Sequence, residues 1–265
     1  MKTNHSSEFF YQLFALIAAV IMVHAVYVAV IRPNAAAIME EQLAREAAGE
    51  TVVAERTFYV VVKDYEQESC FILMLWAIAI MGYKARRSIH ERGLFQQPLL
   101  RVNEGSRILP EDARQLSRPI QALPLGQQGF LLPRALLAGL QRFGATRSIQ
   151  DVSHAVSEVC DTESDKLDSE LSMVRYIAWA IPSIGFIGTV RGIGDALGQA
   201  DKAVQGDIAG VTASLGVAFN STFIALVISI LVMFFMHQLQ LLQERLVLDA
   251  HGYCDENLLR HLKTE

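Results

Sequence analysis

The stretch IPSIGFIGTVRGIG, residues 181–194, places one proline and several glycines inside one of the most apolar parts of the chain. A helix surrounded by lipid gains nothing from so many small residues. A helix that packs on another helix does, because small side chains let two backbones approach closely. This composition therefore predicts a membrane helix, residues 173–197, that packs on protein.

A second stripe of small residues lies on the next apolar segment, residues 212–237, and larger residues such as Phe219 and Phe223 occupy its other faces. The segment between them, residues 198–211, is short enough to be the turn of an antiparallel pair. We expect the two stripes to face each other. The residues expected to pack the two helices together are Pro182, Gly185, Gly188, Gly192, Ala218 and Ala225.

Hydroxyl groups lie within both stripes. Thr189 and Thr222 are almost equally far from the midpoint of the turn, so a regular hairpin places them at one depth in the membrane. Asn220 and Ser221 add polarity at that depth, where a polar group needs a protein partner or water. The pattern favours a polar path for ions lined by Thr189, Thr222, Ser221 and Asn220. Helix packing alone, with GxxxG from Gly188 to Gly192, is the alternative.

The composition indicates a membrane protein. The chain has 265 residues, of which 52% are hydrophobic and 19% are charged, whereas soluble domains have about 25% charged residues. The net charge of −5 and the lack of a basic cluster argue against a nucleic-acid partner. Three scattered cysteines show no metal-binding or disulfide spacing. We therefore expect no metal and no cofactor.

Four segments can form helices that span a bilayer, whose core takes about 20 helical residues. Lys84, Arg86 and Arg87 follow the second segment, and basic residues mark the cytoplasmic side. The sequence thus predicts an all-α protein with four membrane helices, long cytoplasmic helical extensions and both termini inside. A cleaved signal peptide over residues 1–37 is the competing interpretation of the N-terminus. The predicted spans are 9–31, 69–86, 173–197 and 212–237; the cytoplasmic segments are 1–8, 87–172 and 238–265; the outer segments are 32–68 and 198–211.

The apolar runs within the four spans contain no Asp or Glu, so any membrane carboxylate is expected to come from another chain. These runs are residues 9–31, 70–83, 176–190 and 211–236. His24 lies inside the first run and is expected to be a neutral, packed histidine and not a proton relay. Arg191 and Asp195 are four residues apart and are expected to pair on one helix face.

Two motifs carry a family resemblance. GFIGTVRGI (185–193) resembles the second-helix signature of the MotA/TolQ/ExbB proton-channel family, and VAFNSTFIAL (217–226) resembles the helix that follows it. By this similarity, Thr189 and Thr222 correspond to the family's channel-lining threonines, and Pro182 to a proline of flagellar stator subunits. Ala225 replaces a common glycine, and Asn220 stands where relatives vary, which leaves the choice of ion open.

The resemblance implies five copies of the chain around two single-span partner helices, each bearing an Asp, in a bacterial inner membrane. Flow of H⁺ or Na⁺ would then drive rotary work. A small-molecule transporter or a scaffolding membrane protein is the alternative within the membrane class. An enzyme is not expected, because residues 185–198 lack the GK[ST] of a P-loop and the GxGxxG spacing, and no HExxH occurs.

Overall fold

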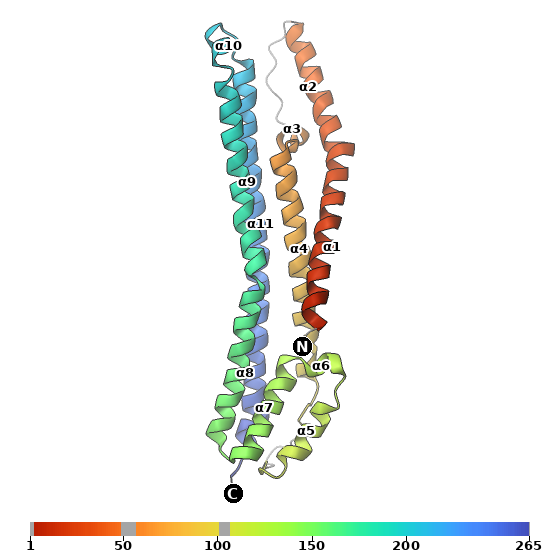
Figure 1. The fold of residues 1–265 in the computed structure, drawn as a ribbon, viewed down its shortest axis with the longest axis vertical. Coiled ribbons are helices and arrows are strands. Elements are labelled where there is room, and N and C mark those ends of the chain that lie inside the picture. Colours follow the sequence, from red (N-terminus) through yellow and green to blue (C-terminus); the bar gives the residue numbers. More distant parts are fainter. Residues whose placement is uncertain (1–2, 49–56, 101–106, 265) are drawn as a thin grey trace. The chain divides into compact units, whose positions relative to one another are not determined.

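The computed structural model describes residues 3–48, 57–100 and 107–264. Within these ranges the chain is helical and forms no β-strand, only a backbone bridge between Ile108 and Leu262. The predicted all-α class is confirmed. The elements in Figure 1 are α1 (Thr3–Val26), η1 (Tyr27–Ile31), α2 (Arg32–Ala47), α3 (Phe58–Val62), α4 (Tyr65–Arg92), η2 (Gly93–Gln96), α5 (Ala113–Gln121), α6 (Leu125–Gln128), α7 (Leu131–Thr146), α8 (Ile149–Glu170), α9 (Ser172–Leu197), α10 (Ala200–Val204), α11 (Ala209–Asn257) and η3 (Leu259–His261).

Four helical segments of the described chain are long and apolar enough to cross a membrane, as the sequence predicts. Each of them contains one predicted span. The segments are Ser7–Gln42, Tyr65–Gln96, Ile149–Leu197 and Ala209–His261.

The first of these segments continues through a proline. Pro33 has no N–H to donate within the helix, and its ring crowds the preceding turn. Just before it, η1 is a π-helical turn in which the Arg32 N–H donates to the Tyr27 carbonyl. This wider turn accommodates Pro33, so α1, η1 and α2 follow one another without a break. Arg32 therefore continues the helix that carries His24.

The chain divides into two compact units. The first unit consists of residues 1–81 and 173–236, and it contains most of the apolar helical sequence. The second unit consists of residues 82–172 and 237–265.

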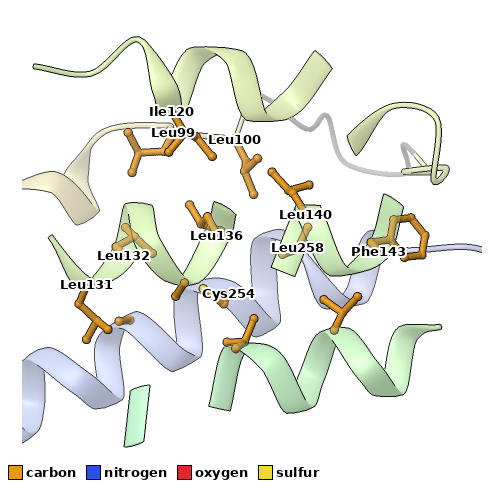
Figure 2. Close-up of a cluster of buried hydrophobic side chains, with 14 of the residues drawn as sticks. Leu99, Leu100, Ile120, Leu131, Leu132, Leu136, Leu140, Phe143, Cys254 and Leu258 are labelled. Carbon is orange, nitrogen blue, oxygen red and sulfur yellow. The ribbon is translucent and has the colours of Figure 1, made fainter. Parts of the chain in front are cut away.

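The core of the second unit is built on α7, whose leucines recur at helical spacing. Figure 2 shows these leucines between α5 and the segment before it on one side and the C-terminal part of α11 on the other. At the end of α7, Arg147 adopts a left-handed conformation (φ 57°), and the Ser148 hydroxyl then caps α8 by accepting the Asp151 N–H (3.3 Å). The buried residues labelled in Figure 2 are Leu99, Leu100, Ile120, Leu131, Leu132, Leu136, Leu140, Phe143, Cys254 and Leu258.

A buried carboxylate joins α7 to α8 in the same unit. Glu163 is only 4% exposed, and it accepts hydrogen bonds from Arg134 (2.6 Å) and Lys166 (2.7 Å). Burial acts to raise the pKa of Glu163, but the hydrogen bonds and charges of Lys166 and Arg134 outweigh it and lower that pKa. The ionised form is thus the one that the fold stabilises.

This cluster predicts an acid-dependent loss of stability. Because the pKa of Glu163 is lower in the folded than in the unfolded chain, its contribution is present above the ordinary glutamate pKa of 4.5 and is lost as the pH falls through the lowered folded value. The contribution should be about 1–2 kcal/mol, since Arg134 and Lys166 are partly exposed. Thermal unfolding of the full chain in detergent should show less acid destabilisation for Glu163→Gln than for the wild type. Equal acid sensitivity of the two proteins would contradict this prediction.

Candidate ion-path site

Within the first unit, α9 and the part of α11 up to Met236 run side by side in opposite directions (Figure 1). The two helices contact each other through backbone as well as side chains. A Cβ atom on Gly188 would lie 2.5 Å from the Cβ of Ser221. A Cβ atom on Gly192 would lie 2.7 Å from the carbonyl oxygen of Ser214. No side chain fits at these distances, so only glycine permits the contact.

The residues expected to pack the helices lie along this contact. Gly185, for example, is so near α11 that an added Cβ would lie 2.5 Å from the Cβ of Ala225. Pro182 is half-buried within α9. The buried members of the set are Gly185, Gly188, Gly192, Ala218 and Ala225.

Thr189 of α9 and Thr222 of α11 are hydrogen-bonded to each other through their hydroxyl groups. The direct contact places the two threonines at one level along the α9–α11 pair. Each hydroxyl also has a backbone acceptor: Thr189 Oγ1 lies 3.1 Å from the Ala218 carbonyl oxygen, and Thr222 Oγ1 lies 3.1 Å from the Gly185 carbonyl oxygen.

The hydroxyl pair can donate in either direction. A hydroxyl has one proton and accepts through two lone pairs, so one threonine donates to the other while the second donates to a carbonyl. Reversing the direction of the Thr189–Thr222 bond requires only that both hydroxyls rotate, because both carbonyls are already in place. Both side chains are half-buried. The pair therefore combines fixed positions with an adjustable proton arrangement.

The other two polar residues of the predicted path lie elsewhere on α11. Ser221 is 1% exposed, and its hydroxyl accepts a hydrogen bond from the Gln67 amide (3.4 Å), so it faces α4. Asn220 is half-buried. Further along α11, the Ser229 hydroxyl donates to the Ala178 carbonyl (3.1 Å). The two threonines, and not Ser221, form the hydroxyl pair between α9 and α11.

Sequence reasoning missed the polar first turn of α4. This helix begins at Tyr65, before the predicted span start at residue 69. Glu68 in this turn is 6% exposed, accepts a hydrogen bond from Arg32, and lies 2.7 Å from Nδ1 of His24. The fold thus brings a carboxylate from outside the apolar runs to a histidine inside the first run. The expectation that another chain supplies a carboxylate within the membrane stays a prediction.

Arg191 also has a different partner from the one expected. Its guanidinium donates to both carboxylate oxygens of Glu66, at 2.7 and 2.9 Å, instead of pairing with Asp195 on its own helix. The bidentate geometry matches the planar guanidinium, which explains why the distant glutamate is preferred. A usable sequence signal was present: Glu66, Gln67 and Glu68 directly precede the second apolar run and continue its helix.

Among the described residues, no group of three or more His, Cys, Asp or Glu side chains could hold a metal ion. The three cysteines, Cys70, Cys160 and Cys254, are buried free thiols. The candidate site therefore consists of hydroxyl, carbonyl, amide, imidazole, guanidinium and carboxylate groups.

Four apolar helices, two of them in close contact around a hydroxyl pair, define a multi-pass membrane protein with polar groups at the depth of its spans. The model of the MotA/TolQ/ExbB proton channel family matches residues 129–251, so this part of the chain is a domain of that family. The matched region includes α7, α8, α9 and both threonines. No curated protein and no solved structure matches the chain.

Proposed function

We propose that this chain is the channel-forming subunit of an ion-driven motor complex in a bacterial inner membrane, and that H⁺ or Na⁺ passes beside Thr189 and Thr222. The family match supports the general part of this proposal, a membrane subunit of a proton channel. The observation that carries the proposal is the hydroxyl pair at one depth between two apolar helices. Ser221 and Asn220 are weaker candidates for lining the ion path than the two threonines, since Ser221 faces α4.

The chemistry of the pair suits a carboxylate that gains and loses a proton. An ionised carboxylate only accepts hydrogen bonds, whereas a protonated one also donates. A threonine hydroxyl serves both forms, and the backbone carbonyls of Gly185 and Ala218 can accept a hydrogen bond from whichever hydroxyl does not donate to the carboxylate. We propose that the carboxylate is an Asp on a single-span partner helix.

The proposed assembly is a homopentamer around two partner helices. Large apolar side chains on α9 and α11 are more than half exposed on the single chain and need lipid or neighbouring subunits to cover them. In this arrangement residues 87–172 and 238–265 are cytoplasmic, and residues 32–68 and 198–211 lie outside. The exposed side chains are Phe186, Ile187, Val190, Phe219 and Phe223.

A scaffolding role is the second candidate, and one observation favours it. Both threonine hydroxyls find acceptors within the α9–α11 pair, at the Ala218 and Gly185 carbonyls. A packing contact alone would use the same bonds. The two candidates differ in whether ions move when the hydroxyls are intact.

Reconstitution tests the proposal. The chain is co-expressed with a candidate partner, a single-span protein that bears an Asp in its membrane helix. The complex is weighed by native mass spectrometry, and proton entry into liposomes is followed with a pH-sensitive dye under an imposed potential. We expect five copies with two partners and a proton or sodium flux. Monomers in mild detergent, or an intact complex that passes neither ion, would contradict the proposal and leave the scaffolding role.

A further inference from the structure

The first turn of α4 contacts four other helices, α1, α2, α9 and α11, through three successive side chains. Glu68 binds His24 and Arg32, Gln67 donates to Ser221, and Glu66 pairs with Arg191. The Glu68 side chain is 7% exposed, whereas the His24 side chain is 58% exposed. An almost fully buried carboxylate thus binds a histidine that is open on its other side.

The bonding indicates which nitrogen of His24 carries the hydrogen. Arg32 donates to one oxygen of Glu68, and an ionised carboxylate only accepts hydrogen bonds. Opposite an ionised Glu68, the Nδ1 atom of His24, 2.7 Å from Oε1, carries a hydrogen and donates it. In the neutral imidazole the other nitrogen, Nε2, then keeps its lone pair and can bind a proton.

The remaining charges around the pair are largely matched to one another. Arg191 binds Glu66 and lies 3.9 Å from Asp64. Lys63 precedes Asp64 in the chain, and its ammonium contacts the sulfur of Met39. Two charged groups then lie nearest to His24: Glu68, which it contacts, and Arg32, which binds the other oxygen of Glu68.

Two aromatic side chains complete the surroundings. The Arg32 guanidinium lies over the rings of Tyr65 (4.3 Å) and Tyr27 (5.6 Å). Tyr27 is 1% exposed, and its hydroxyl has no hydrogen-bond partner among the described residues. Arg32 is held between these rings and Glu68, so His24 is the adaptable member of the group.

We propose that His24 is a proton-binding site within the membrane, with Glu68 as its fixed counter-ion. The proton binds at Nε2 and converts the hydrogen bond between Nδ1 and Glu68 into an ion pair, which is shorter and stronger. The charge of His24 thereby sets how tightly α1 holds the first turn of α4. That turn also presents Gln67 to Ser221, the residue next to Thr222. The site is separate from the hydroxyl pair and does not depend on the proposed function.

Nitrogen NMR of the full chain in lipid nanodiscs tests this site. The seven histidines are labelled with ¹⁵N, and the His24 signals are identified by their loss in His24→Asn. In the wild type, we expect the neutral ring to carry its hydrogen on Nδ1, and the ring to take up a second proton between about pH 5 and 9.

Glu68→Gln tests the role of the carboxylate. It replaces a group that only accepts hydrogen bonds by an amide that also donates, so the neutral His24 ring should no longer be confined to one tautomer, whereas Arg32→Gln keeps the carboxylate and should keep the hydrogen on Nδ1. The wild-type spectra are decisive if neither variant folds. Thr189→Val with Thr222→Val should leave the titration unchanged, which separates this proposal from the ion path.

A ring that stays neutral across the whole range would overturn the proposal. So would a neutral ring that has the same tautomer in the wild type and in Glu68→Gln. Either result would leave the His24–Glu68 bond as a packing contact between α1 and α4.

Discussion

Replacing Gly192 by alanine should separate α9 from α11 and cost about 1–3 kcal/mol of stability, the usual penalty for overpacking. The added Cβ atom would lie 2.7 Å from the Ser214 carbonyl oxygen and 2.8 Å from the Ala218 backbone nitrogen. Because both atoms belong to the α11 backbone, no flexible side chain can move aside. Thermal unfolding in detergent should show a lower Tm, and size-exclusion chromatography should show a smaller assembled fraction.

Gly194 provides the matched control two residues further along α9. A Cβ atom at Gly194 would have no neighbouring atom within 4 Å. Alanine there should leave assembly unchanged and raise stability by up to about 1 kcal/mol, because alanine is the better helix former. If Gly192→Ala and Gly194→Ala gave the same Tm, the close contact between α9 and α11 would not exist as described.

The double substitution Thr189→Val with Thr222→Val should leave assembly intact and reduce ion flux by about a hundredfold. This factor is the lower end of the rate loss expected when a group that assists proton transfer is removed. Valine has the branched shape of threonine without the hydroxyl. The carbonyls of Gly185 and Ala218 lie within helices and keep their backbone partners. The measurement is dye-reported proton flux in liposomes, together with native mass spectrometry of the same sample.

Ser229→Ala serves as the control for the loss of a hydroxyl. Ser229 donates to the Ala178 carbonyl (3.1 Å), away from the threonine pair, so its removal costs one similar bond. We expect the ion flux to stay within about twofold of the wild type. The lost hydrogen bond contributes about 1 kcal/mol to stability, and Ser229 does not line the proposed ion path. Near-normal flux in the double valine variant, with assembly confirmed, would falsify the conduit role and assign both threonines to packing.

Much of the fold follows from regular local rules. A membrane segment must satisfy its own backbone hydrogen bonds, so each apolar run of sufficient length predicts a helix, and four such helices are present. The helical rise is constant, so equal distances from the turn place Thr189 and Thr222 at one level of the helix pair, in agreement with their hydrogen bond. Val152 and Val156 have helical spacing in the sequence, and both are buried in α8.

Only the tertiary structure determines which distant charges meet. From the sequence, the partner of Arg191 is Asp195, because residues four apart share a helix face; in the folded chain it is Glu66, 125 positions away. From the sequence, Glu68 belongs to an outer segment. In the folded chain the packing of α1 and α4 places it beside His24 and Arg32. Periodicity along one helix determines which face is apolar, but side-chain ion pairs between helices depend on the relative rotation and height of those helices. These are set by packing, here by the Gly188 and Gly192 contacts with α11 and by the first turn of α4.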